Sequence, residues 1–212
     1  MTPRGSINTI AFGVFPRRRP LLLTNPAPRF CLQCGSDRME LRIPHDDDRE
    51  RHVCGDCGYI HYLNPKLVVG TVPVWEDQVL LCKRAIEPRY GFWTLPAGYM
   101  EEGESLEAGA IRETLEEANA RVRIEQQYVT LSLPQISQVY MMFRATLLDR
   151  DFSAGTESLD VRLFREEEIP WDEIAFTTIR RTLQHYFADR KTGIYAPLCA
   201  EIIHPHRGAP DA

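Results

Sequence analysis

The sequence predicts an α+β fold preceded by a small zinc ribbon, and two patterns carry this prediction. Apolar and β-branched runs typical of strands precede one helical pattern, and further strands and a closing helix follow it, unlike the alternation of a doubly wound parallel sheet. Two C-x2-C cysteine pairs precede all of these elements. The 212 residues, 43% of them hydrophobic and 26% charged, suit one medium domain with a small additional module.

We expect four segments along the chain: a flexible basic tail over 1–29, the zinc ribbon over 30–62, the main domain over 63–193 and a C-terminal tail over 194–212. The first 36 residues contain five arginines and no acidic residue, and the prolines around "PRRRP" leave little to pack into a core. This composition also occurs in organelle-targeting peptides, which stay open as an alternative to a cytoplasmic location. No apolar run reaches the roughly 18 residues of a membrane-spanning helix.

The ribbon is predicted from cysteine spacing. Nineteen residues separate two C-x2-C pairs, which are formed by Cys31, Cys34, Cys54 and Cys57. A glycine follows each pair and allows a tight turn in which backbone amides face the sulfurs. Two such turns can place four thiolates around a structural Zn²⁺ ion. Disulfide bonds are the alternative, and the ordinary intracellular composition argues against them.

The main domain begins with a predicted hairpin. The runs "VVGTVPVW" and "VLLCKR" flank the short turn "EDQ". Strands are also expected in "GFWTLPAGYM", "YVTLSL", "SQVYMMFRATLL" and "DVRLFREEEI". The segment "TTIRRTLQHYFADRKTG" has helical spacing and ends at Gly193, and we expect residues 195–212 to form an irregular tail.

The acidic segment over residues 105–119 is predicted to be a helix capped by Ser105. At 100° per residue, Glu113, Glu116 and Glu117 fall within an arc of about 100°. The opposite face, expected to pack on the sheet, is made by Ala110, Ile111, Thr114, Leu115 and Ala118. Three clustered carboxylates provide the hard oxygen ligands that Mg²⁺ or Mn²⁺ requires, and a merely solvated acidic helix is the alternative.

These acids also belong to a longer pattern. Gly98, Glu104 and the segment "RETLEEAN" resemble the Nudix box, G-x5-E-x7-R-E-U-x-E-E-x-G-U, in which U is aliphatic. Together with the ribbon and the flanking strands, the resemblance covers roughly residues 30–190. It is closest to zinc-ribbon Nudix pyrophosphatases that act on dinucleotide cofactors. The resemblance implies a Nudix-type α/β/α sandwich with a mixed sheet.

The sequence departs from the box at three positions. Thr114 and Ala120 occupy aliphatic positions, and Asn119 replaces a glycine. A residue just after a helix often has positive φ, and asparagine tolerates this conformation better than other non-glycine residues. We therefore expect Asn119 to adopt the left-handed conformation.

The resemblance implies a role for each matching residue. Glu113, Glu116 and Glu117 would bind Mg²⁺ or Mn²⁺ together with the backbone carbonyl of Ala97. Glu104 and Arg112 would form an ion pair that braces the loop against the helix, and Gly98 would shape the loop under the metal. Arg84 would orient a glutamate or a phosphate, with a simple surface arginine as the alternative.

The implied reaction is hydrolysis of a pyrophosphate. Metal ions neutralise the phosphate oxygens and lower the pKa of the attacking water, and a carboxylate accepts its proton. Within the box, Glu116 or Glu117 can serve as this base. Outside it, Glu157 lies in a loop before a strand, where related enzymes often place the base; an exposed loop acid is the alternative.

The family suggests a nucleoside diphosphate linked to another moiety as substrate, with AMP or another nucleoside monophosphate released. NADH is less favoured than FAD or ADP-ribose, because "LSLPQISQVYMMFRA" lacks the SQPWPFPxS motif of NADH pyrophosphatases. An RNA-cap pyrophosphohydrolase and a non-catalytic nucleotide-binding regulator are the alternatives. The net charge of −5 argues against nucleic acid as a partner. No membrane partner is expected, and a homodimer is the oligomer common among related enzymes.

Overall fold

The computed structural model describes residues 27–203. The basic tail expected over residues 1–29 therefore lies almost entirely outside the described residues, as do residues 204–212 of the expected C-terminal tail. None of the helices in the described part of the chain is long and apolar enough to cross a membrane.

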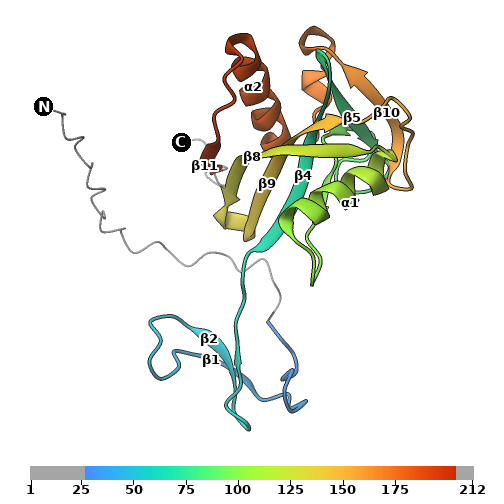
Figure 1. Cartoon of the computed structure of the whole chain (residues 1–212). Helices are drawn as coiled ribbons and strands as arrows, with labels where there is room; N and C mark the ends of the chain where they lie inside the picture. The colour runs from blue at the N-terminus through green and yellow to red at the C-terminus, as the bar shows by residue number, and fades with distance from the viewer. Residues whose placement is uncertain (1–26, 204–212) are drawn as a thin grey trace, which may run out of the picture.

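The N-terminal module is a small antiparallel sheet. Its strands are β1 (Met39–Arg42), β2 (Arg51–Cys54) and β3 (Ile60–His61), in the order β1-β2-β3. The first two strands flank the acidic turn, in which Asp46 has a φ of 65°. Figure 1 shows this module apart from the larger sheet, joined to it by the chain before β4.

The main domain contains an eight-stranded mixed sheet. Its strands are β4 (Lys66–Trp75), β5 (Gln78–Arg84), β6 (Trp93–Thr94), β7 (Ala97–Tyr99), β8 (Val122–Leu133), β9 (Gln138–Leu147), β10 (Ser158–Phe164) and β11 (Leu198–Glu201). The central order is β10-β5-β4-β9-β8-β11, with β6 paired to β5 and β7 paired to β4. The pairs β4–β9 and β8–β11 are parallel, and the other pairs are antiparallel.

Two α-helices and three short 3-10 turns complete the domain: α1 (Leu106–Ala118), α2 (Thr177–Thr192), η1 (Pro134–Ile136), η2 (Glu166–Glu168) and η3 (Trp171–Glu173). Both helix ends expected from the sequence are confirmed. The Ser105 side chain accepts a hydrogen bond from the Ala108 backbone N–H, and Gly193 ends α2 with a φ of 71°. Gly193 suits this position because it has no Cβ to oppose positive φ.

The helices lie on opposite faces of the sheet (Figure 1). The period-2 alternation of β5 explains this arrangement. Leu80 and Cys82 pack in the core beneath α1, whereas Val79 and Leu81 pack in the core that α2 covers. The predicted α/β/α sandwich with a mixed sheet is therefore confirmed.

The end of the chain differs from the expected irregular tail. Residues 198–201 form β11, which pairs in parallel with β8 at the edge of the sheet. The Gln126 side chain donates a hydrogen bond to the Tyr195 carbonyl at 3.0 Å, and Gln135 donates one to the Ile202 carbonyl at 3.0 Å. Four-residue strands carry little periodicity, so a lone edge strand of this kind is difficult to predict from the sequence.

Candidate active site

A cavity of about 810 Å³ lies where α1, the ends of β5 and β7, the β8–β9 connection, the loop before β10 and the start of α2 meet. All four carboxylates proposed for catalysis line it: Glu113, Glu116, Glu117 and Glu157. Gly98, Ala97, Arg84 and Arg112 also line its wall. Segments that are far apart in the sequence thus place the predicted residues around one space.

Arg112 and Glu104 form the predicted brace. Arg112 Nε and Nη2 donate to the two Glu104 carboxylate oxygens at 3.0 and 2.8 Å. The Glu101 backbone N–H donates to the same carboxylate at 2.7 Å. Chiefly because of the hydrogen bonds from Arg112, the pKa of Glu104 falls to about 2. This two-pronged ion pair fixes the loop that precedes α1 onto the helix.

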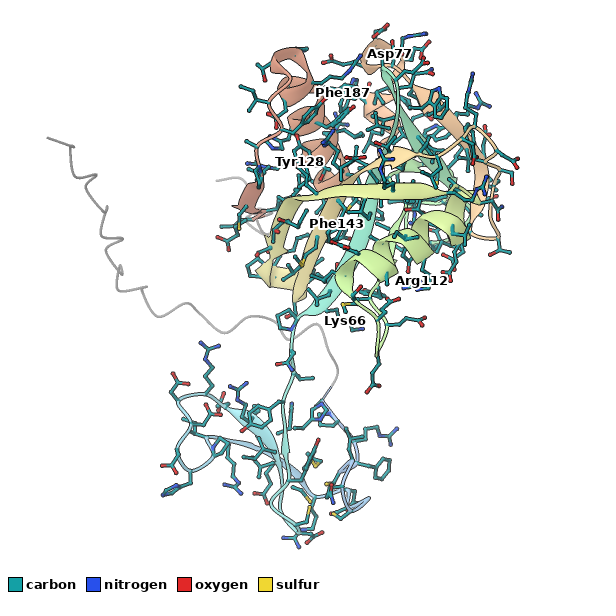
Figure 2. All side chains as sticks on the ribbon, in the orientation of Figure 1. Lys66, Asp77, Arg112, Tyr128, Phe143 and Phe187 are labelled. Carbon is teal, nitrogen blue, oxygen red and sulfur yellow. The ribbon has the colours of Figure 1, made fainter. Side chains whose placement is uncertain are left out.

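Arg112 also reaches the other box acids. Its Nη1 donates to Glu113 at 2.6 Å and to Glu116 at 3.0 Å, and its Nη2 donates to the Tyr99 carbonyl at 3.1 Å. Figure 2 shows Arg112 on α1. A single guanidinium therefore holds two proposed metal ligands in position and reduces the repulsion between them.

Glu117 is the most deeply buried of the box acids. It is 7% exposed, and its Oε2 atom has no hydrogen-bond partner among the described residues. Burial, followed by the charge of Glu113, raises its pKa to about 8, although Arg84 and the Ala97 backbone lower it. Because a buried unpartnered carboxylate oxygen is costly, its environment fits a bound cation.

Glu157 and Arg84 face this buried acid from neighbouring segments. The charge of Glu157 raises the pKa of both Glu113 and Glu117, which places Glu157 near the box acids rather than in solvent alone. The Ala85 backbone N–H donates to the Glu157 carbonyl at 2.8 Å and fixes this part of the loop to the end of β5. Arg84 Nε donates to the Pro88 carbonyl at 3.0 Å.

The expected packing face of α1 is wrong in part. Ile111 and Leu115, expected to pack on the sheet, are 38% and 48% exposed, whereas Glu113 and Glu117 are buried. The buried face contains Gly109, Ala110, Glu113, Thr114, Glu117 and Ala118. The acids can face inward because a cavity, rather than packed side chains, lies next to this part of the helix.

Gly98 makes room for one of these acids. A Cβ atom built on Gly98 would meet all three atoms of the Glu113 carboxyl group. The glycine of the box is therefore required by close approach to a carboxylate, since the φ of Gly98 is not positive.

Asn119 has the predicted left-handed conformation, with φ 48° and ψ 25°. Its side-chain amide makes hydrogen bonds that a glycine at this position could not make. The Asn119 amide donates to Ser153 Oγ at 3.1 Å and lies within 3.4 Å of the Ser153 and Ala154 carbonyls. The backbone N–H groups of Ser153 and Gly155 donate to the last carbonyls of α1 at 2.9 and 3.0 Å. Asn119 thus helps attach the loop that carries Glu157 to the end of the box helix.

Replacing Asn119 by glycine is expected to keep the turn and loosen this loop. Loss of exposed hydrogen bonds worth about 1 kcal/mol predicts a fall in kcat of up to roughly fivefold, with KM little changed. Steady-state kinetics and hydrogen exchange over residues 151–157 test this. In a Glu157→Gln background the same substitution should have no further effect. Unchanged exchange in the loop would show that the amide does not hold it.

The four ribbon cysteines converge as predicted. They are the only group of three or more metal-binding side chains, within residues 27–203, whose ligand atoms all lie within 4.8 Å of one another. The shortest Sγ–Sγ distances are 3.6 Å, far longer than the roughly 2.05 Å of a disulfide bond. Hydrogen bonds from the backbone of Cys57 and Asp56 lower the pKa of Cys54 to about 6, whereas neighbouring thiols and burial raise the pKa of Cys34 and Cys57. This donor set fits a tetrahedral Zn²⁺ ion.

By the same distance criterion the three box carboxylates do not form such a compact group. Arg112 Nη1 binds both Glu113 and Glu116. The sequence also missed part of the cavity wall. Tyr99, Phe176 and the first residues of α2 line the cavity. No local motif around residue 176 indicates that α2 begins beside the box.

Two family models match the chain. The zinc-ribbon model described as Nudix N-terminal matches residues 29–63, and the NUDIX domain model matches residues 64–190. A crystal structure of a NUDIX hydrolase from Nitrosomonas europaea is 57% identical, with a TM-score of 0.79, and the match covers 82% of this chain and 98% of that one.

Two curated relatives are more distant. The NAD-capped RNA hydrolase NudC of Vibrio parahaemolyticus is 29% identical over 173 residues, which are 76% of this chain and 62% of that protein. The ADP-ribose pyrophosphatase of Methanocaldococcus jannaschii is 25% identical over 116 residues, 53% of this chain and 69% of that protein. The chain thus spans less than two thirds of the length of the NudC relative. With the box acids in one cavity and the domain model over residues 64–190, the chain belongs to the Nudix family.

Proposed function

We propose that the protein is a divalent-cation-dependent hydrolase that cleaves the pyrophosphate linkage of a nucleoside diphosphate joined to another moiety. The observation that carries this proposal is the buried, unpartnered carboxylate oxygen of Glu117 in a cavity that Glu113, Glu116 and Glu157 also line. Arg84, Arg89 and Arg112 are the cationic side chains that line the cavity, and Arg112 is bonded to Glu104 as well as to Glu113 and Glu116. A wall of this charge repels a pyrophosphate unless a cation intervenes.

Each residue has a distinct part in the proposed reaction. Glu113, Glu116 and Glu117 would hold Mg²⁺ or Mn²⁺ with the Ala97 carbonyl. The bound cation would supply Lewis-acid chemistry, neutralising phosphoryl oxygens and lowering the pKa of the attacking water.

Other side chains position the acids, the substrate and the proton. Arg112 keeps Glu113 and Glu116 in place, and Arg84 would orient a phosphoryl oxygen. Glu157 would accept the proton of the attacking water, because it lies near the box acids but outside the helix. The ribbon cysteines would bind a structural Zn²⁺ ion that has no role in this chemistry.

FAD and ADP-ribose are the favoured substrates, and NADH is less favoured. The segment that replaces the motif of NADH pyrophosphatases forms part of the cavity, through Leu133, Ile136, Gln138 and Tyr140. These side chains would meet the moiety beyond the pyrophosphate. The resemblance to the ADP-ribose pyrophosphatase of Methanocaldococcus jannaschii supports this choice.

Hydrolysis of a nucleotide cap on RNA is the second candidate. It is favoured by the NudC relatives, whose names give NAD-capped RNA as their substrate. The cavity would take the cap in the same way as a free dinucleotide, while the RNA would extend beyond it. The expectation that the partner is a small nucleotide and not a nucleic acid therefore remains a proposal, as does a homodimer.

A substrate panel tests the proposal. The protein with Mg²⁺ is incubated with FAD, ADP-ribose, NADH, diadenosine polyphosphates and NAD-capped RNA, and release of AMP or of the decapped 5′ end is measured. We expect the highest kcat/KM with FAD or ADP-ribose. A preference for capped RNA would establish the second candidate, and nucleotide binding without turnover of any substrate would indicate a regulator.

A further inference from the structure

The amino end of α2 forms part of the cavity wall, together with Tyr140 and Leu133. Phe176, the N-cap residue, has no side chain that can cap the helix. No hydrogen bond joins the backbone N–H groups of Thr177, Thr178 or Ile179 to a described residue outside the helix. These groups carry the positive end of a 16-residue helix.

A buried hydroxyl lies at the same place. Thr178 lines the cavity and is only 3% exposed, yet its Oγ1 atom has no hydrogen-bond partner in the described part of the chain. The Tyr140 phenol is its polar neighbour: burial raises the pKa of Tyr140 and the nearby Thr178 hydroxyl lowers it, although the two hydroxyls are not placed for a hydrogen bond of normal geometry. A buried hydroxyl without a partner costs free energy, which a bound acceptor would recover.

The charges around this end of the cavity favour an anion. The Arg84 guanidinium lies 5.1 Å from the centre of the Phe176 ring. Arg84 lines the same cavity as the carboxylates, and its charge lowers the pKa of both Glu117 and Tyr140. No acidic residue of α2 or of η3 is among the residues that line the cavity. The cavity wall thus combines the hydrogen-bond donors at the start of α2 with carboxylates from other segments, including Glu87 beside Arg84.

We infer that the amino end of α2, with the Thr178 hydroxyl and Arg84, is a second oxyanion subsite that binds a phosphoryl group of the nucleotide without a metal ion. The assignment of this phosphoryl group to the substrate rests on the proposed function. The box carboxylates would hold, through their metal ion, the phosphoryl group that is attacked, and the start of α2 would hold a neighbouring one. Helix amino ends with free N–H groups bind phosphates in this manner.

The test uses the full-length protein with the ribbon zinc retained and no divalent metal at the box, and inorganic phosphate as the probe. Chemical shifts of backbone amides are followed by NMR as phosphate is added without divalent metal, with chloride at matched ionic strength as the blank. We expect saturable shifts at Thr177, Thr178 and Ile179. Replacing Thr178 by valine should weaken phosphate binding roughly tenfold, because the hydrogen bond lost is to a charged group.

Thr182→Val is the matched control. Thr182 is equally buried one turn along the helix, and its hydroxyl donates to the Thr178 carbonyl at 2.9 Å instead of facing the cavity. This variant should bind phosphate as the wild type does. If Thr178→Val does not fold, Thr178→Ser keeps the hydroxyl and should retain binding, and the wild-type titration alone remains decisive.

Three results would overturn the inference: no shift at these amides, equal binding by the Thr178→Val variant, or shifts caused by adenosine but not by phosphate. The last result would make this end a base-binding subsite. Because the titration involves neither a divalent metal at the box nor turnover, its result is independent of the substrate panel. An inactive protein that binds phosphate here would refute the proposed function alone.

Discussion

Replacing Glu117 by glutamine is expected to abolish magnesium-dependent hydrolysis and to stabilise the metal-free protein. Turnover should fall at least about a hundredfold, because the variant loses a carboxylate from the proposed metal site. The amide is nearly isosteric and carries no charge, so the fold should persist. Glu116→Gln should have a similar effect on turnover. Because the Glu116 side chain is 58% exposed, this variant should stabilise the metal-free protein less than Glu117→Gln does.

The stability change follows from the pKa of Glu117. Its carboxyl has a pKa of about 8 in the folded protein against 4.5 for the free side chain. The folded state therefore binds a proton more tightly than the unfolded state. In EDTA, the contribution of Glu117 to the free energy of unfolding is greatest below about pH 4.5 and falls as the pH rises toward 8. The stability lost through this group between low pH and pH 7 is on the order of 3 kcal/mol.

Thermal unfolding in EDTA across this pH range measures the effect. The wild type should lose stability between about pH 5 and pH 8 by more than the Glu117→Gln variant does. Glu107→Gln is the matched control, because Glu107 is an exposed acid on the same helix. If Glu117→Gln lowered the melting temperature in EDTA, or kept near wild-type turnover, the proposed role of Glu117 would be wrong.

Removing zinc is expected to unfold the ribbon and leave the sandwich folded. The ribbon has very little apolar core of its own: Val53, Cys31 and Cys54 are its buried hydrophobic residues in the described part. The binding free energy of a structural zinc, about 10–16 kcal/mol at pH 7, would therefore supply most of its stability. The two sheets share no strand pairing, so loss of one should not unfold the other.

The variant Cys34→Ser tests this against Cys199→Ser, since both cysteines are exposed but only Cys34 belongs to the cluster. Bound zinc is measured by metal analysis, and folding by hydrogen exchange over residues 29–63 and 64–190. Cys34→Ser should lose zinc and exchange protection in the ribbon alone. Full protection of the ribbon after complete removal of zinc would show that the metal is not what folds it.

Some parts of the site could be read from the sequence because their determinants are local. The Glu104–Arg112 ion pair, the Ser105 cap and the left-handed Asn119 each depend on residues within or next to one helix, where spacing fixes geometry. The four cysteines also follow from spacing, since each C-x2-C pair folds back on itself through a glycine with positive φ.

Other parts depend on long-range contacts. Periodicity predicted Ile111 and Leu115 on the packed face of α1, because apolar residues usually face a core. In the structure these two residues are exposed, and Glu113 and Glu117 are buried beside a cavity. The loop bonded to Asn119 is more than thirty residues away in the chain. The start of α2 reaches the cavity only because β8, β9 and β10 place it there, and no local pattern marks Thr178 as a cavity residue.

We propose that this carboxylate-lined cavity hydrolyses a pyrophosphate with the help of a divalent cation. The most direct measurement is AMP release from ADP-ribose by protein stripped of divalent metal, before and after Mg²⁺ is added back, with the zinc of the ribbon retained. We expect no AMP before the addition, and release that rises with Mg²⁺ and saturates. AMP released at the same rate in the absence of Mg²⁺ or any other divalent ion at the box would contradict the account.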